Sequence, residues 1–123
     1  MSQKCRDRSA KINEFLEKYK FELQSIDLKT KKIIQNTETI EQMTSMFLKR
    51  EISAKTVILL FCNAAVAAQN KTNCLTEILF EEALKRAEFM DEFVASQGKL
   101  FGPFHGVPFS IKDTFDIEGF GNY

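Results

Sequence analysis

Glycine and proline, the residues that most often interrupt regular backbone, are confined to one end of this chain of 123 residues. All 5 glycines and both prolines lie between residues 98 and 121, so residues 1–97 contain neither. Because proline and glycine end, kink or weaken helices, a long stretch without them favours a series of helices. The glycine-containing end is expected to hold turns and short extended segments.

The spacing of apolar residues predicts two helices in the first half of the chain. The first has an apolar stripe with the i, i+3, i+4, i+7 spacing of one helix face. That stripe consists of Ile12, Phe15, Leu16, Tyr19 and Leu23. A connection with a solvated patch of lysines is expected over residues 25–37. Thr39 and Gln42 then have the spacing of a capping box, which predicts a helix running to about Arg50.

Two further helices are predicted over about residues 54–69 and 81–96. Ser53 is the N-cap candidate of the first, and Gly98 is the C-terminal stop of the second. The expected apolar face of the 54–69 helix consists of Val57, Leu60, Phe61, Ala64, Ala65 and Ala68. Ile58, Leu59 and Val66 widen that face, so the helix should be buried on more than one side. A chain of this length offers little to bury it with, which indicates that further structure packs against it.

Two short segments have the alternation of a strand. Over residues 74–80 a strand is one interpretation of the apolar pattern that precedes the last helix. Over residues 107–112 a strand would place Val107, Phe109 and Ile111 on one side. Ser110 and Lys112 would then lie on the other side.

Charge and cysteine content exclude several classes of protein. Lys+Arg and Asp+Glu are both 17, which argues against nucleic acid as the main partner. No apolar stretch is long enough for a membrane span, and the N-terminus has no apolar signal core, so we expect a cytoplasmic protein. Cys5, Cys62 and Cys74 contain no C-x-x-C pair, and His105 is the one histidine. We therefore expect free thiols in a reducing compartment, with no metal site and no cofactor.

Residues 102–119, with the sequence GPFHGVPFSIKDTFDIEG, resemble the lysine-bearing segment of the amidase signature family. That family has a run G-P-L-x-G-[IV]-P-x-x-[IVL]-K-D at the end of a core strand. Upstream, the chain is similar to the fungal acetamidase-like branch: a capped helix, a serine in a turn, an Ala-rich helix, the run Asn73–Glu77, and a helix that starts with acidic residues. The resemblance covers about residues 38–120.

The resemblance implies an α/β fold class. The chain would supply N-terminal helices plus the first one or two strands of the family's mixed-sheet α/β/α fold. The fold would therefore be incomplete in this chain. Residues 1–37 would form an N-terminal helix and connection. Residues 38–123 would form the N-terminal portion of an amidase domain, truncated before the family's Gly/Ser-rich signature.

The same resemblance makes Lys112 the lysine of a Ser–cis-Ser–Lys triad. A lysine at the end of a buried strand is desolvated, which lowers its pKa and lets the neutral amine accept a proton. The proton would come from the nucleophilic serine through the bridging serine. Both serines lie downstream in the family, in a Gly/Ser-rich run that is absent from this sequence.

Local alternatives to this triad are weaker. Ser110 and Lys112 would stand about 6.5–7 Å apart along a strand, too far for direct activation of the serine. His105 could be a general base but fits a turn histidine better. Asp113 would orient a turn, with Asp116 solvated. Surface charges without a metal are expected at Glu81, Glu82, Asp91 and Glu92.

Three functions remain open. The first is the N-terminal part of an amidase, an acylamide amidohydrolase that converts a carboxylic amide and water to carboxylate and amine. Its substrate would be a small amide, and this chain alone would be inactive. The alternative is a catalytically silent remnant that pairs with another, longer amidase chain. The third is an unrelated helical module. With few strands to complete a sheet, we expect marginal stability in isolation, with residues 39–96 the best formed.

Overall fold

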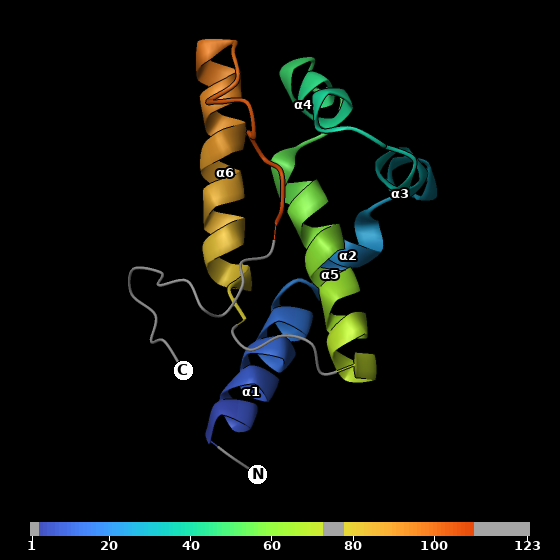
Figure 1. Ribbon diagram of the computed structural model, residues 1–123, viewed down its shortest axis with the longest axis vertical. Coiled ribbons are helices and arrows are strands. Elements are labelled where there is room, and N and C mark those ends of the chain that lie inside the picture. Colours follow the sequence, from blue (N-terminus) through green and yellow to red (C-terminus); the bar gives the residue numbers. More distant parts are fainter. Residues whose placement is uncertain (1–2, 73–77, 110–123) are drawn as a thin grey trace.

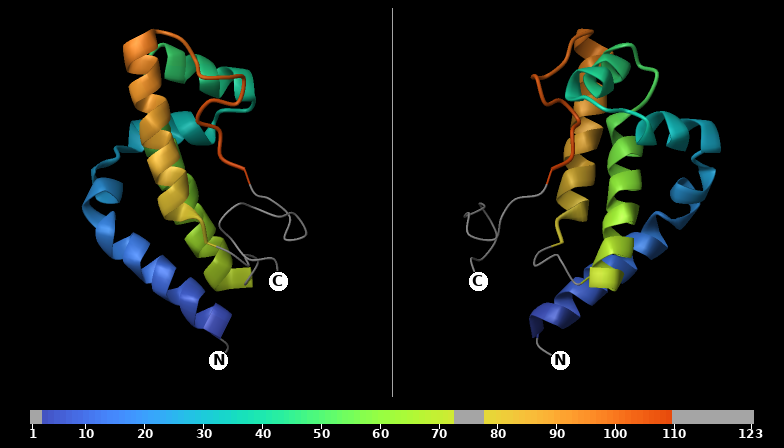
Figure 2. Two further views of the ribbon diagram at one scale, coloured as in Figure 1. Left: turned by 90° about the vertical axis from the view of Figure 1, so that its left-hand side faces the viewer. Right: turned by 45° about the vertical axis from the view of Figure 1, so that its right-hand side comes forward.

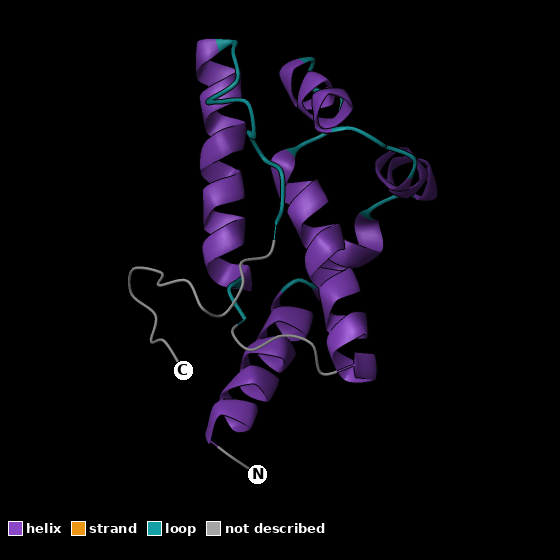
Figure 3. Ribbon diagram, in the orientation of Figure 1, coloured by secondary structure: helices purple, strands orange, loops and turns teal. Residues whose placement is uncertain are grey.

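The computed structural model describes residues 3–72 and 78–109 of the chain (Figure 1). The six helices of these residues follow one another with short connections. They are α1 (Gln3–Lys18), α2 (Lys20–Ser25), α3 (Leu28–Gln35), α4 (Ile40–Leu48), α5 (Ala54–Thr72) and α6 (Phe80–Gln97). Within the described ranges, all regular structure is helical (Figure 3).

The long helices α5 and α6 form an antiparallel pair at the centre of the molecule (Figure 1). Helix α1 crosses the base of this pair, α4 lies beside its upper end, and α3 lies on the side of α5 away from α6 (Figures 1 and 2). Apolar side chains from α1, α3, α4, α5 and α6 meet in one buried core. At its base, the rings of Phe15 and Phe80 meet edge to face with 5.0 Å between centroids.

The predicted first helix is in fact two helices. The apolar stripe is correct as far as Ile12, Phe15 and Tyr19, which are buried. However, α1 ends at Lys18, and Tyr19 takes φ −108° and ψ 12° before α2 starts. Burial of Tyr19 in the core accompanies this change of direction, and an apolar period cannot show such a break.

The expected connection over residues 25–37 contains a helix that was not predicted. Asp27 is the N-cap of α3, and its Oδ1 accepts a hydrogen bond from the Thr30 amide at 2.8 Å. An Asp three residues before the amide that it caps was a signal available in the sequence.

The capping box of α4 is confirmed. Thr39 Oγ1 accepts from the Gln42 amide at 3.1 Å, and Gln42 Oε1 accepts from the Thr39 amide at 3.2 Å. The helix ends at Leu48, two positions before the expected end, in a Schellman motif. Arg50 there has φ 61°, and the Glu51 amide donates to the Met46 carbonyl at 3.0 Å.

The predicted buried face of α5 is only partly correct. The buried residues of α5 are Ala54, Val57, Ile58, Leu59, Cys62, Val66 and Gln69. Ala64 and Ala68 are exposed, and Phe61 is 44% exposed. A helix that is apolar around most of its girth gives no pattern that identifies the face its neighbours cover. Phe61, Ala64 and Ala68 therefore form an exposed apolar face of α5.

The expected strands are not seen in the described residues. Ile78 and Leu79 are irregular and Phe80 already begins α6, while residues 74–77 lie outside the described ranges. Residues 107–109 have no regular structure, and 110–112 also lie outside. A strand is stable only when paired, and the described residues supply no partner strand. The described residues therefore do not show the expected first strands of a mixed sheet.

Candidate functional site

The residues that could carry chemistry follow the end of α6. Gly98 ends the helix as predicted, with φ 68° and its amide donating to the Val94 carbonyl at 3.0 Å. The segment 99–109 then turns back beside α4 (Figures 1 and 2). Two turn hydrogen bonds shape it: the His105 amide donates to the Gly102 carbonyl at 3.2 Å, and the Val107 amide donates to the Phe104 carbonyl at 3.1 Å.

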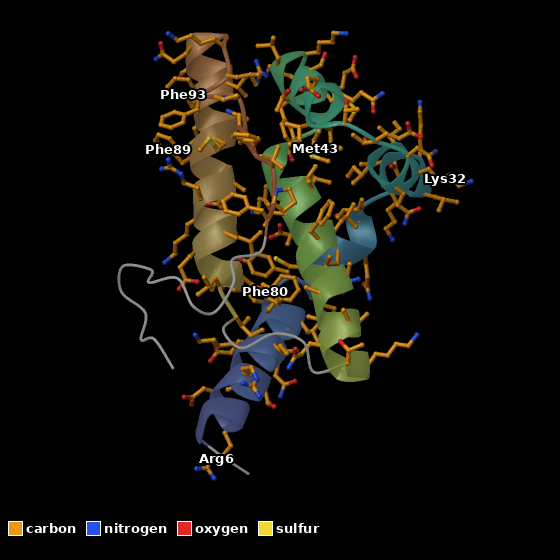
Figure 4. The ribbon with its side chains drawn as sticks, viewed as in Figure 1. Arg6, Lys32, Met43, Phe80, Phe89 and Phe93 are labelled. Atoms are coloured by element: carbon orange, nitrogen blue, oxygen red, sulfur yellow. The ribbon has the colours of Figure 1, made fainter. Side chains whose placement is uncertain are left out.

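An aromatic cluster anchors the start of this segment to α6. The Phe101 ring meets the rings of Phe89 and Phe93 edge to face, with centroid distances of 5.5 and 5.1 Å. Figure 4 shows Phe89 and Phe93 on the side of α6 that faces away from α5. The Arg86 guanidinium lies 4.9 Å from the Phe89 centroid and 5.1 Å from that of Phe101. A cation over two rings adds to the attachment of the segment to the helix.

His105 anchors the other end of the turn. Its side chain is 2% exposed, and its ring centroid lies 5.8 Å from that of Phe47 in α4. Nδ1 accepts a hydrogen bond from the Phe101 amide at 3.0 Å. Burial lowers the pKa of His105, and the nearby Asp91 carboxylate opposes this only in part. His105 therefore lies in a turn, as its sequence context favoured, and is neutral near pH 7.

Gly106 lets the backbone approach the core at this point. Its φ is +71°, which an L side chain rarely adopts. A Cβ placed there would lie 2.7 Å from Phe47 Cε2 and 3.0 Å from the Ala54 Cβ. The glycine in the G-[IV]-P part of the motif is thus required both by its backbone conformation and by the lack of space for a side chain.

Asp91 joins α6 to the N-terminus of α5. Its Oδ1 accepts from the Ala54 amide at 2.7 Å, and its Oδ2 accepts from the Lys55 amide at 3.0 Å. Ser53 Oγ accepts from the Thr56 amide at 3.1 Å, as the N-cap prediction required. The interpretation of Asp91 as a surface charge of its helix was therefore wrong. No local pattern relates residues 91 and 54, so only the fold reveals this cap.

Replacing Asp91 with alanine should lower the free energy of unfolding by about 1–3 kcal/mol, because two amides at a helix N-terminus lose a charged acceptor. Urea unfolding of the chain measures the change. The exposed neighbour Glu92, replaced by alanine, is the matched control and should change the stability by less than about 0.5 kcal/mol. Equal losses in the two variants would show that the cap does not stabilise the fold.

The remaining candidate residues are placed as follows. Lys112, Ser110, Asp113 and Asp116 lie outside the described residues. Among the residues that are described, no group of three His, Cys, Asp or Glu side chains could hold a metal ion. Cys62 is a free buried thiol, and burial raises its pKa to about 12. None of the helices in the described ranges is long and apolar enough to cross a membrane.

Comparison with known proteins assigns the family. The family model "Amidase" matches residues 56–122, so this chain belongs to the amidase family. The match includes α5 except its first two residues, all of α6 and the whole lysine-bearing string. It confirms the family resemblance that residues 102–119 suggested.

Fungal amidases are among the similar proteins. "Amidase 2" of Gibberella moniliformis is 47% identical over 68% of this chain and 16% of its own length. "Amidase" of the same fungus is 39% identical over 80% of this chain and 19% of its own length. "Acetamidase" of Emericella nidulans is 39% identical over 57% of this chain and 13% of its own length. This chain thus spans less than a fifth of the relatives it matches. No solved structure matches it.

Proposed function

We propose that this chain is the N-terminal part of an amidase that hydrolyses carboxylic amides, with Lys112 as its proton acceptor. The observation that carries the proposal is the family match over residues 56–122, which includes the string GPFHGVPFSIKD with Lys112 at its end. The similarity to fungal amidases and an acetamidase supports a small amide as substrate. The free buried thiol of Cys62 supports a reducing compartment such as the cytoplasm.

The proposed reaction is acyl transfer to water in two steps. A neutral Lys112 accepts, through a bridging serine, the proton of a serine that attacks the amide carbonyl. The C–N bond breaks, the amine leaves with a proton, and water then releases the carboxylate. Backbone amides of the Gly/Ser-rich run would stabilise the oxyanion. Because this sequence holds neither that run nor its serines, the chain alone is expected to be inactive.

A second function is favoured by the exposed apolar surface. Phe61 is 44% exposed, Phe104 63% and Phe109 79%, and all lie within the family match. A catalytically silent chain could bury these rings against another, longer amidase chain. The two functions differ in where the missing serines come from: the continuation of this polypeptide or a partner.

The coding sequence past Tyr123 separates the two at little cost. A Gly/Ser-rich run with paired serines in any reading frame supports the amidase proposal. Absence of such a run in all frames contradicts it and leaves the paired remnant. Co-purification with a full-length amidase then tests that remnant, and recovery of this chain without a partner would contradict it.

Activity can be tested in a chimera. The segment of the 47% identical relative that this chain matches is replaced by the corresponding residues of this chain. We expect the chimera to release ammonia from acetamide or a larger amide at a rate within about tenfold of the relative's own. A chimera that unfolds in one cooperative transition but releases no ammonia would contradict the proposal. Two chimeras are made, one joined before α4 and one before α5, so that a failure caused by a misplaced junction in one of them is recognised.

A further inference from the structure

One ring nitrogen of His105 is buried and finds no hydrogen-bond partner within residues 3–72 and 78–109. Nδ1 accepts from the Phe101 amide at 3.0 Å, so in the neutral ring Nδ1 carries no proton. The proton of the neutral imidazole therefore sits on Nε2. Nε2 is buried and has no hydrogen-bond partner among the residues that the structure describes. The hydrogen bond to Nδ1 therefore requires the neutral ring with its proton on Nε2.

Three helices and the segment 99–109 meet around this imidazole. Phe47 of α4 contacts the ring, and Phe47 and Ala54 lie against the adjacent Gly106. Asp91 of α6 acts electrostatically on His105 while capping the first turn of α5. Phe101, which donates its amide to His105, is also the residue whose ring is attached to Phe89 and Phe93. One neutral side chain thus connects the segment to the junction of the helices.

We infer that His105 is a positioning residue: its neutral, Nε2-protonated form latches the segment 99–109 onto the junction of α4, α5 and α6, and its protonation releases that segment. Lys112 follows the segment by three residues in the sequence. Any effect of this latch on the catalytic role of Lys112 rests on the proposed amidase function, whereas the attachment of the segment by His105 does not. The family reaction, as proposed above, uses no histidine.

Protonation removes the latch for two reasons. Protonation puts a hydrogen on Nδ1, so two N–H donors, Nδ1 and the Phe101 amide, face each other and their hydrogen bond is lost. It also places a positive charge on a side chain that is buried against Phe47, where burial disfavours it. Asp91 is the charge that favours the imidazolium, but both of its oxygens already accept amide hydrogens. The Lys55 ammonium nearby in α5 pairs with Glu22 and Glu88, each at 3.2 Å.

The direction of the pH dependence follows from burial. The pKa of His105 in the folded chain lies below the ordinary histidine value of about 6.5, so the unfolded chain binds this proton more readily. The contribution of the latch is complete above about pH 6.5 and is lost as the pH falls through the folded pKa.

Because His105 is the one histidine of the chain, NMR can follow it without ambiguity. The experiment is a pH titration of the 123-residue chain, in which the added ligand is the proton. We expect ring nitrogen shifts of the Nε2-protonated tautomer at pH 7.5, and a protection factor of the Phe101 amide that falls at least about tenfold as His105 titrates. A protonated Nδ1 at pH 7.5, or Phe101 protection that does not follow His105, would overturn the inference.

His105→Asn is the matched variant, because its Oδ1 takes the place of Nδ1 but cannot titrate. It should keep the Phe101 protection above pH 6.5 and lose the pH dependence below it. His105→Leu should lose the protection at every pH. If the Asn variant loses protection at the same pH as the original chain, another group is the switch and the inference is wrong. None of these readouts requires amidase activity, so their failure is distinct from failure of the proposed function.

Discussion

Changing Lys112 to alanine in a folded, active chimera is expected to lower kcat for amide hydrolysis about a thousand-fold. The alanine variant has no group to accept the proton that leaves the nucleophilic serine. The loss should appear mainly in kcat and only weakly in KM, because proton transfer occurs in the transition state and not on binding. Ammonia release at saturating amide measures it.

Lys112→Arg distinguishes a base from a cation. A guanidinium keeps the charge but does not give up its proton in proteins, so the arginine variant should be as inactive as the alanine variant. Partial activity with arginine would indicate that residue 112 supplies a positive charge and not a base. Lys99→Ala is the matched control, since Lys99 is an exposed lysine of the same segment and should leave the rate unchanged. A Lys112→Ala chimera with unchanged kcat would contradict the assignment of the proton acceptor.

Local signals predicted three helix ends correctly. The capping box of Thr39 and Gln42, the Ser53 N-cap and the Gly98 stop all depend on residues within a few positions of one another. Such contacts can be inferred from spacing because the backbone fixes the distance. The missed helix α3 had the same kind of signal in Asp27.

Contacts between distant segments were not predictable in this way. Asp91 caps amides 37 and 36 positions earlier, and His105 lies against Phe47. The buried face of α5 was misassigned for the same reason, because only its neighbours decide which part of an apolar girth is covered. The expectation for Lys112 depends on the motif around it, because apolar periodicity alone predicts an ordinary strand-end lysine there.

Gly106→Ala is expected to lower the free energy of unfolding by about 2–4 kcal/mol. A left-handed conformation costs an L residue about 1–2 kcal/mol, and overpacking of a core costs about 1–3 kcal/mol. Both costs apply here, because φ is +71° and the new Cβ would lie 2.7 Å from Phe47 Cε2. Phe47 is itself buried in the core, so its ring has little room to move. Urea unfolding of the chain and the variant measures the difference.

Two other glycines of the same segment separate these costs. Gly98 has φ +68° but open space where the methyl group of an alanine would lie, so Gly98→Ala should show only the conformational cost of about 1–2 kcal/mol. Gly102 has neither constraint, and Gly102→Ala should leave the stability nearly unchanged. The excess loss at Gly106 over Gly98 then measures the close approach of the segment to Phe47 and Ala54. If Gly106→Ala costs no more than Gly98→Ala, the segment does not pack against α4 and α5 in solution, and the latch at His105 loses its structural basis.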